Sequence, residues 1–173
     1  TAPSITLINP GDGCNGSIIK DGYLYCADNE WSVWGLNIWD LNDSDSPLHV
    51  DYYAATDADY GIVNVALAND VIVTSGLCGL ETFSFDGTTI SQLNDYNASD
   101  CLDTNREKFR GLDTNGAGNL VASSYFMLNW DEWLTGASGV ILLNVDESGT
   151  LTLHSNYPDY YLTRIAKFIQ NPN

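Results

Sequence analysis

The sequence GLNIWDLNDSDSPLHVDY, residues 35–52, contains two alternating runs of apolar and polar residues separated by a turn rich in Asp, Ser and Pro. Alternation with a period of two is typical of β-strands that bury one face. Clusters of Asp, Ser and Pro favour turns. This segment therefore predicts two antiparallel strands joined by a polar turn.

The glycine-led strand of this segment recurs twice. Gly79-Leu80 and Gly139-Val140 align with Gly35-Leu36, at spacings of 44 and 60 residues. Each strand ends in a polar residue, an apolar residue and then Asn or Asp, which is typical of a turn capped by a side chain. These triplets are Asp40-Leu41-Asn42, Ser84-Phe85-Asp86 and Asn144-Val145-Asp146. A period near 44 residues in strand-rich units indicates propeller blades.

The returning strands can be overlaid in the same way. The overlay places His49, Asn94 and His154 at one repeat position. It places Tyr52, Tyr96 and Tyr157 at another, each preceded by Asp or Asn. A histidine that recurs by repeat symmetry is typical of a structural strand residue, so neither histidine is expected to be catalytic.

The predicted fold class is all-β, with propeller-type four-stranded antiparallel repeats in a single domain, residues 1–173. The repeat units are expected over approximately residues 14–54, 61–97 and 109–157. Their strands are predicted over residues 14–19, 23–27, 35–40 and 48–53, then 61–67, 71–75, 79–85 and 89–95, then 109–114, 119–124, 139–145 and 150–157. Helix signals are weak, and residues 105–108 could form at most one turn.

Two further strands are predicted at the ends of the sequence, over residues 4–9 and 162–169. Closed propellers have four or more blades, so three units do not close a ring by themselves. The two terminal strands could pair with each other and complete a blade within the subunit. They could instead pair with neighbouring subunits, because an unpaired edge strand is a template for another chain. Head-to-tail pairing of that kind produces a polymer when it does not close.

The pattern Gly-Leu-x-Ile-x-Asp-Leu-x-Asp-x-x-x-Pro in residues 35–47 resembles the LVIVD repeat of bacterial and archaeal surface propellers. In the other two units the turns at residues 85–87 and 145–149 are similar to the Asp-x-Gly turns of lactonase-type propellers. The resemblance covers most of the chain at the level of blades. It implies a propeller-like fold and a surface location, and it transfers no catalytic residues.

The net charge is −17, from 23 acidic and 6 basic residues. A field of this sign repels nucleic acids and anionic membranes, so neither is an expected partner. It attracts cations and keeps the molecule soluble. Abundant turn aspartates and adaptation to salt are two explanations of this acidity that the composition does not separate.

The four cysteines allow three pairings. Cys14 and Cys26 flank a predicted hairpin with its turn near residues 20–22, and they would lie nearly opposite each other across it. We favour disulfides between Cys14 and Cys26 and between Cys78 and Cys101; free buried thiols are the alternative. A zinc site is not expected, because no cysteine pair has CxxC spacing.

Three glycosylation sequons are present, at Asn15, Asn42 and Asn97, all in predicted turns or loops. The chain begins at Thr1 and contains no apolar leader segment or membrane span, so we expect any signal peptide to have been removed. These features together predict a secreted or cell-surface glycoprotein.

No catalytic motif is visible. The sequence lacks Gly-x-Ser-x-Gly, His-Glu-x-x-His and a phosphate-binding glycine loop, so no enzyme, catalytic residue or cofactor is expected. A lactonase-like hydrolase would need a metal or acid–base cluster that the sequence does not present. Residues 40–46, Asp57 and Asp59 could offer oxygen ligands to Ca²⁺, but they lack the spacing of an EF-hand loop. A solvated turn is the favoured interpretation.

Two aromatic loops lie at equivalent positions, between the second and third strands of the first and third units. Tryptophan rings beside carboxylates suit stacking on sugar rings, and tryptophan is also enriched in protein interfaces. The candidate binding or interface residues are Glu30, Trp31, Trp34, Trp130, Glu132 and Trp133.

The sequence therefore favours a non-enzymatic extracellular structural or interaction protein. We expect it to assemble with copies of itself into a surface polymer or filament through pairing of its terminal strands. The alternative is a monomeric carbohydrate-binding or adhesion module that uses the tryptophan loops.

Overall fold

The computed structural model of the chain describes residues 14–30, 33–43, 45–55, 62–76, 79–96, 107–126 and 138–159. The described residues form three four-stranded antiparallel sheets and contain no helix. In each sheet the strands are hydrogen-bonded in chain order, so every sheet is an up-and-down meander.

The sheets are numbered along the chain. Sheet 1 consists of β1 (Cys14–Lys20), β2 (Tyr23–Glu30), β3 (Val33–Asp40) and β4 (Leu48–Ala54). Sheet 2 consists of β5 (Ile62–Ala68), β6 (Val71–Gly76), β7 (Gly79–Phe85) and β8 (Ile90–Tyr96). Sheet 3 consists of β9 (Glu107–Thr114), β10 (Asn119–Phe126), β11 (Ser138–Val145) and β12 (Leu151–Asp159).

The all-β fold and the four-stranded units are confirmed, and the strand ends differ from those predicted by no more than three residues. Residues 105–108, which the sequence allowed at most one helical turn, are not helical where the structure describes them. Glu107 and Lys108 belong to β9, whose backbone pairs with the end of β10. The predicted terminal strands, residues 4–9 and 162–169, lie outside the described residues.

Tight turns join the first and second strands of sheets 1 and 2. Asp21 and Gly22 have φ angles of 52° and 82°, and Asn69 and Asp70 have φ angles of 50° and 62°. Positive φ at both central residues is typical of the type I′ turn, which matches the twist of a hairpin and favours Asn, Asp and Gly. These turns therefore set the register of both hairpins.

An aspartate closes the turn between the third and fourth strands in sheets 2 and 3. Asp86 Oδ1 accepts hydrogen bonds from Thr88, and Asp146 Oδ1 accepts hydrogen bonds from Ser148. The side-chain hydrogen bonds from Thr88 and Ser148 are the largest causes that lower the pKa of these two carboxyls. The capped turns predicted in these two units are confirmed.

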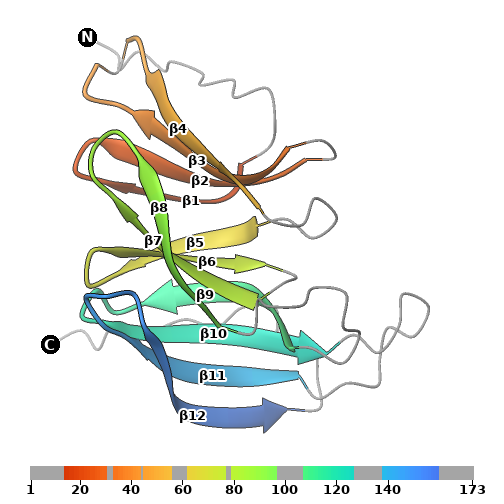
Figure 1. The fold of residues 1–173 in the computed structure, drawn as a ribbon. Coiled ribbons are helices and arrows are strands. Elements are labelled where there is room, and N and C mark those ends of the chain that lie inside the picture. Colours follow the sequence, from red (N-terminus) through yellow and green to blue (C-terminus); the bar gives the residue numbers. More distant parts are fainter. Residues whose placement is uncertain are drawn as a thin grey trace, which may run out of the picture.

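The three sheets stack in chain order, with sheet 2 between sheets 1 and 3 (Figure 1). Apolar side chains fill both junctions. The core between sheets 1 and 2 contains Tyr25, Ala27, Leu36, Ile38, Ile62, Val65, Leu67, Ile72, Phe83 and Ile90. The core between sheets 2 and 3 contains Ala66, Ala68, Val71, Val73, Leu80, Phe109, Leu112, Leu120, Ala122, Ile141, Leu143 and Val145. Sheet 2 is thus covered on both faces, and every residue of β6 is buried.

Candidate functional site

The aromatic loops singled out in the sequence fall mostly outside the described residues. Glu30 and Trp34 belong to the paired ends of β2 and β3, where Asn29 lies opposite Trp34 and Glu30 lies opposite Val33. The residues of this set outside the described part are Trp31, Trp130, Glu132 and Trp133. Their roles in sugar binding or in an interface stay predictions.

The sequons differ in their local structure. Asn42 is exposed in the turn between β3 and β4, as predicted. Asn15 is also exposed, but the prediction that it lies in a turn or loop is wrong. It belongs to β1, at an irregularity between Cys14 and Gly16 where it has no partner in the register with β2. Asn97 lies outside the described residues.

Cys14 and Cys26 form a disulfide, with their Cα atoms 5.5 Å apart. They are not directly opposite each other, because the hairpin turns at Asp21 and Gly22 and β1 is irregular after Cys14. The residue opposite Cys14 is Asp28. The other predicted disulfide partners, Cys78 and Cys101, lie outside the described residues.

Asp40 and Asp43, in the segment of residues 40–46, accept hydrogen bonds within their own turn. Asp40 Oδ1 accepts a bond of 2.8 Å from the Asn42 N–H, and Asp43 Oδ1 accepts a bond of 3.1 Å from the Asp45 N–H. Within the described ranges no group of three His, Cys, Asp or Glu residues is placed to hold a metal ion. Asp57 and Asp59 lie outside those ranges. In the same part of the chain, no helix is long and apolar enough to cross a membrane.

The geometry that bears on function is the repeated packing of one sheet on the next. We call the face of a sheet that points to the following sheet its forward face, and the opposite face its backward face. Side chains alternate between the two faces along each strand. In sheet 1, Leu36 and Ile38 therefore point forward, into the core with sheet 2. Asn37 and Trp39 point backward.

Residues that lie side by side across a sheet form equivalent rows in the three sheets. The first forward row is Gly16–Ala27–Leu36–Tyr53 in sheet 1, Asn64–Ser75–Leu80–Tyr96 in sheet 2 and Gly111–Ser123–Val140–Tyr157 in sheet 3. The backward row is Ile19–Leu24–Trp39–His49, Leu67–Ile72–Phe83–Gln92 and Thr114–Leu120–Leu143–Leu153 in the same order.

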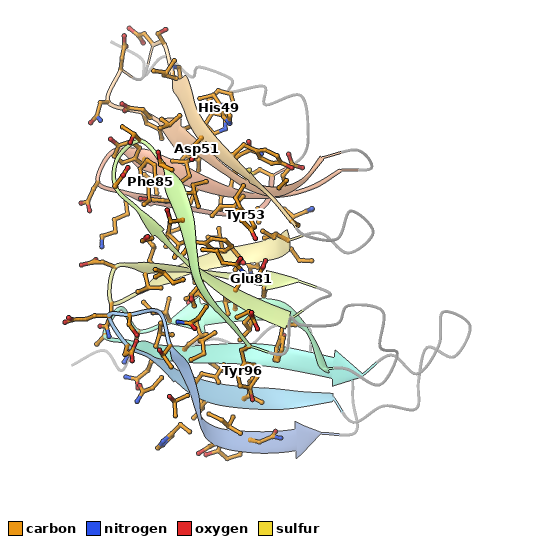
Figure 2. All side chains as sticks on the ribbon, viewed as in Figure 1. His49, Asp51, Tyr53, Glu81, Phe85 and Tyr96 are labelled. Carbon is orange, nitrogen blue, oxygen red and sulfur yellow. A yellow bond between two sulfur atoms is a disulfide. The ribbon has the colours of Figure 1, made fainter. Side chains whose placement is uncertain are left out.

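The tyrosine at the end of the forward row contacts an aromatic residue of the following sheet. The Tyr53 ring lies edge to face with that of Phe83 at 4.7 Å, and the Tyr96 ring lies 6.3 Å from that of Phe109. Figure 2 shows Tyr53 and Tyr96 at the two junctions. In sheet 3 the equivalent residue is Tyr157, which is 58% exposed.

Polar groups also join the sheets at their outer strands. Asp51 Oδ2 accepts a 2.7 Å hydrogen bond from the Ile90 N–H, and the Tyr53 hydroxyl donates to Gln92 Oε1 at 3.1 Å. At the next junction the buried Thr82 hydroxyl donates to the carbonyl of Gly149 at 2.8 Å. Sheets 1 and 2 therefore each bind the backbone of the outer hairpin in the sheet that follows.

Replacing Thr82 with valine is expected to lower the free energy of unfolding by about 1–3 kcal/mol, because the buried Gly149 carbonyl loses its donor. Valine keeps the shape of threonine but cannot donate a hydrogen bond. Urea denaturation of the two proteins measures the difference. The exposed Ser84, two residues along the same strand, provides the control Ser84→Ala; equal losses in both variants would contradict this account of the junction.

A carboxyl lies near the junction of sheets 1 and 2. Glu81 accepts a 3.0 Å hydrogen bond from Gln92 Nε2, and Gln92 Oε1 in turn accepts from the Tyr53 hydroxyl. Burial raises the pKa of Glu81 to about 7, and the negative charge of Asp95 adds to the effect. Glu81 lies at the position that Asn37 occupies in sheet 1 and Ile141 in sheet 3.

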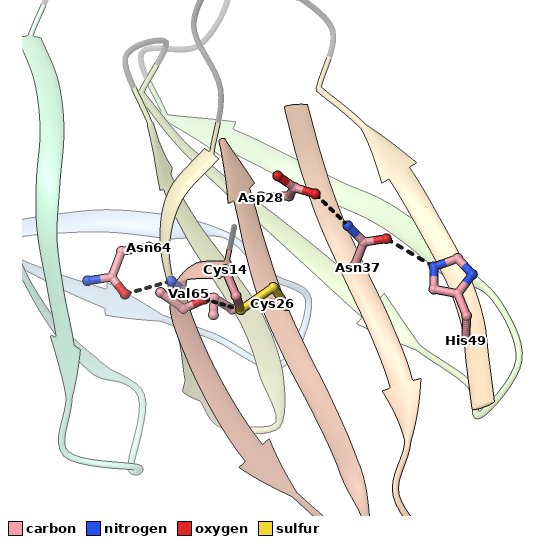
Figure 3. The surroundings of a disulfide bond; sticks show 8 residues. Cys14, Cys26, Asp28, Asn37, His49, Asn64 and Val65 are labelled. Carbon is pink, nitrogen blue, oxygen red and sulfur yellow. Dashed lines mark hydrogen bonds between the residues drawn. A yellow bond between two sulfur atoms is a disulfide. The ribbon is translucent and has the colours of Figure 1, made fainter. Parts of the chain in front are cut away.

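The backward face of sheet 1 is one end of the stack. Its row includes Ile19, which is 65% exposed, and Trp39, whose ring lies 4.9 Å from that of His49. His49 Nε2 is 3.0 Å from Asn37 Oδ1, and Asn37 Nδ2 donates to the buried Asp28 at 3.2 Å (Figure 3). Among the described residues, Trp39 Nε1 is the buried side-chain donor that has no hydrogen-bond partner.

The forward face of sheet 3 is the other end. Val140 and Leu142 on this face are half-buried, Tyr157 is exposed, and Val121 and Ser123 are buried. The described residues include no fourth sheet beyond either end. Closure into a ring is therefore not observed in the described part of the chain.

The sequence overlay of the returning strands was wrong by one residue in sheet 1 and, at the histidine position, also in sheet 2, where Leu93 and not Asn94 is equivalent to His154. An extra residue interrupts the register of β4, β8 and β12 at the same place: Val50, Leu93 and His154. His154 therefore lies opposite no residue of β11, whereas His49 lies opposite Trp39 of β3. The two histidines are not equivalent, and the tyrosine equivalent to Tyr96 and Tyr157 is Tyr53, not Tyr52. The tyrosine that ends each returning strand was the signal that could have found this contact.

The sequence matches no family model and no curated protein. Among solved structures the chain is similar to the N-terminal domain of Nup159, at 8% identity and a TM-score of 0.32. The match covers 86% of this chain and 48% of that chain, so the chain spans about half its length. A TM-score this low carries no argument about function, and the resemblance to the LVIVD repeat stays a prediction.

Proposed function

We propose that this protein is a non-enzymatic extracellular structural protein whose copies assemble end to end into a surface polymer or filament. The observation that supports the proposal is the open stack. Two junctions within the chain bury apolar faces, and equivalent faces stand at both ends with no described sheet beyond them. A head-to-tail contact between such ends gives a filament when it does not close.

Two further features agree with an extracellular location. The Cys14–Cys26 disulfide is a bond that persists in oxidising compartments. The sequon asparagines Asn15 and Asn42 are both exposed. The terminal segments, residues 4–9 and 162–169, are predicted strands that could add to the contact between subunits. The carbohydrate-binding alternative depends on the tryptophan loops, and a glycan array with Trp133→Ala as the comparison tests it.

Assembly is expected to depend strongly on salt, because the subunit carries a net charge of −17 and like charges oppose stacking at low ionic strength. Light scattering after size exclusion should show monomers when salt and divalent cations are removed, and large species when they are restored. Negative-stain microscopy of the large species should show filaments. A single monomeric species at every salt concentration would contradict the proposed function.

A further inference from the structure

We propose that successive copies of this chain meet face to face, with the forward face of sheet 3 in one copy packed on the backward face of sheet 1 in the next. The inference rests on the proposed function and identifies the surfaces that perform it. The contact continues the stacking that already joins sheets 1, 2 and 3 inside the chain.

The forward face of sheet 3 has the chemistry of the forward faces that are already packed. Its row is Gly, Ser, Val, Tyr; the packed rows are Gly, Ala, Leu, Tyr in sheet 1 and Asn, Ser, Leu, Tyr in sheet 2. The tyrosine is retained in all three rows. Tyr53 and Tyr96 are half-buried against the next sheet, whereas Tyr157 is 58% exposed. This face therefore suits the backward face of another sheet of the same kind.

The backward face of sheet 1 has the chemistry of the backward faces that are already covered. In sheets 2 and 3 the middle of this row is fully buried, as Phe83 and Leu143 show. In sheet 1 the equivalent residue is Trp39, which is half-buried, and the same row begins with the exposed Ile19. Burying such apolar surface stabilises association.

The repeat predicts which side chains meet. Tyr53 packs on Phe83, and Phe83 occupies the position of Trp39 in its own sheet. By equivalence with this junction, Tyr157 of one copy packs against Trp39 of the next. At the other junction the ring contact of Tyr96 is with Phe109 of β9, which does not occupy the Trp39 position. An edge-to-face contact of two aromatic rings is favourable beyond the area that it buries.

A second copy is the occupant that the geometry favours. The two faces lie at opposite ends of the stack, so within the described residues they cannot meet (Figure 1). They are different surfaces, and a contact between them is head-to-tail, which repeats from copy to copy.

One residue makes this contact more polar than those inside the chain. A second forward row runs through Ile18–Tyr25–Ile38 in sheet 1, Ala66–Val73–Thr82 in sheet 2 and Asp113–Val121–Leu142 in sheet 3. In this row sheet 3 has the half-buried Asp113 where sheets 1 and 2 have Ile18 and Ala66. A carboxylate at a junction opposes burial unless a cation or hydrogen bonds accompany it. The contact between copies is therefore more polar at this position than the junctions inside the chain.

The test uses two variants that each block one face. Tyr157→Glu places a charge on the forward face of sheet 3, and Ile19→Glu places one on the backward face of sheet 1. Both side chains are exposed, so the fold of the subunit tolerates the change. At a salt concentration where the wild type assembles, each variant alone should stay monomeric by light scattering. An equimolar mixture should form a dimer, because one intact face of each kind remains.

Leu48→Glu is the matched control, since Leu48 is 66% exposed and belongs to neither row. It should assemble as the wild type does. Normal assembly of Tyr157→Glu and Ile19→Glu would overturn the inference. The proposed polymer would then have to form through pairing of the terminal strands instead. A monomeric mixture would likewise overturn the inference. Reduced thermal stability of either variant as a monomer would show that the replaced side chain packs within its own subunit, and it would also overturn the inference. A wild type that never assembles would remove the proposed function itself.

Discussion

Replacing Phe83 with alanine is expected to lower the free energy of unfolding by about 3–5 kcal/mol, the usual cost of truncating a buried aromatic ring. Phe83 is 0% exposed and lies in the core between sheets 1 and 2, where its ring contacts Tyr53. The alanine variant leaves a cavity at the junction and removes the ring contact. Small domains are stable by about 5–15 kcal/mol, so this variant should lose much of its stability.

Urea denaturation under low-salt conditions measures this loss on the monomer. The control Ser84→Ala changes the next residue of β7, which is exposed, and should change stability by less than about 0.5 kcal/mol. Phe83→Leu keeps most of the apolar volume and should fall between the two. A loss below about 1 kcal/mol for Phe83→Ala would mean that the two sheets do not pack through this residue.

Replacing Glu81 with glutamine is expected to stabilise the protein above pH 7 by up to about 3 kcal/mol, and to have little effect below pH 4.5. Burial raises the pKa of Glu81 from 4.5 to about 7, so the folded protein holds a proton that the unfolded chain releases between these values. The free energy of unfolding therefore falls as pH rises through this window. Glutamine remains neutral and removes that loss.

The measurement is the difference in unfolding free energy between Glu81→Gln and the wild type at pH 4, 6 and 8. Taking the difference cancels the titration of the other carboxyls. Asp95→Asn removes the neighbouring charge and should lower the pKa of Glu81. Its gain in unfolding free energy above pH 7 should therefore be smaller than that of Glu81→Gln. A difference that does not vary with pH would show that Glu81 titrates as an exposed carboxyl does.

The sequence was sufficient for the strands and for the repeat, because the alternation of apolar residues is strong and the turns carry their own chemistry. The strand Gly79–Phe85 has the predicted bounds. The Asp21-Gly22 turn and the aspartate-capped turns follow from residue types that favour these conformations. These features are local, and local patterns are visible along a single chain.

The paired rows were not predictable in the same way, because they depend on the register across four strands. An irregularity in β4, β8 and β12 shifts each outer strand by one residue. Such a shift leaves no mark in the pattern of apolar residues, so that pattern did not show that His49 lies opposite Trp39 while His154 has no partner in its register. Trp39 was not among the interface residues predicted from the sequence for a related reason. The exposure of its side chain depends on which sheet is the first of the stack, and that is not a local pattern.

The shared tyrosine rows have a consequence for how such proteins change in evolution. Duplicating or deleting one whole unit in the interior would lengthen or shorten the subunit and leave its first and last surfaces as they are. Under the proposed end-to-end assembly, subunits of different lengths would then remain compatible and could join the same fibre. Growth of the gene by complete modules is thus the change that this architecture tolerates best.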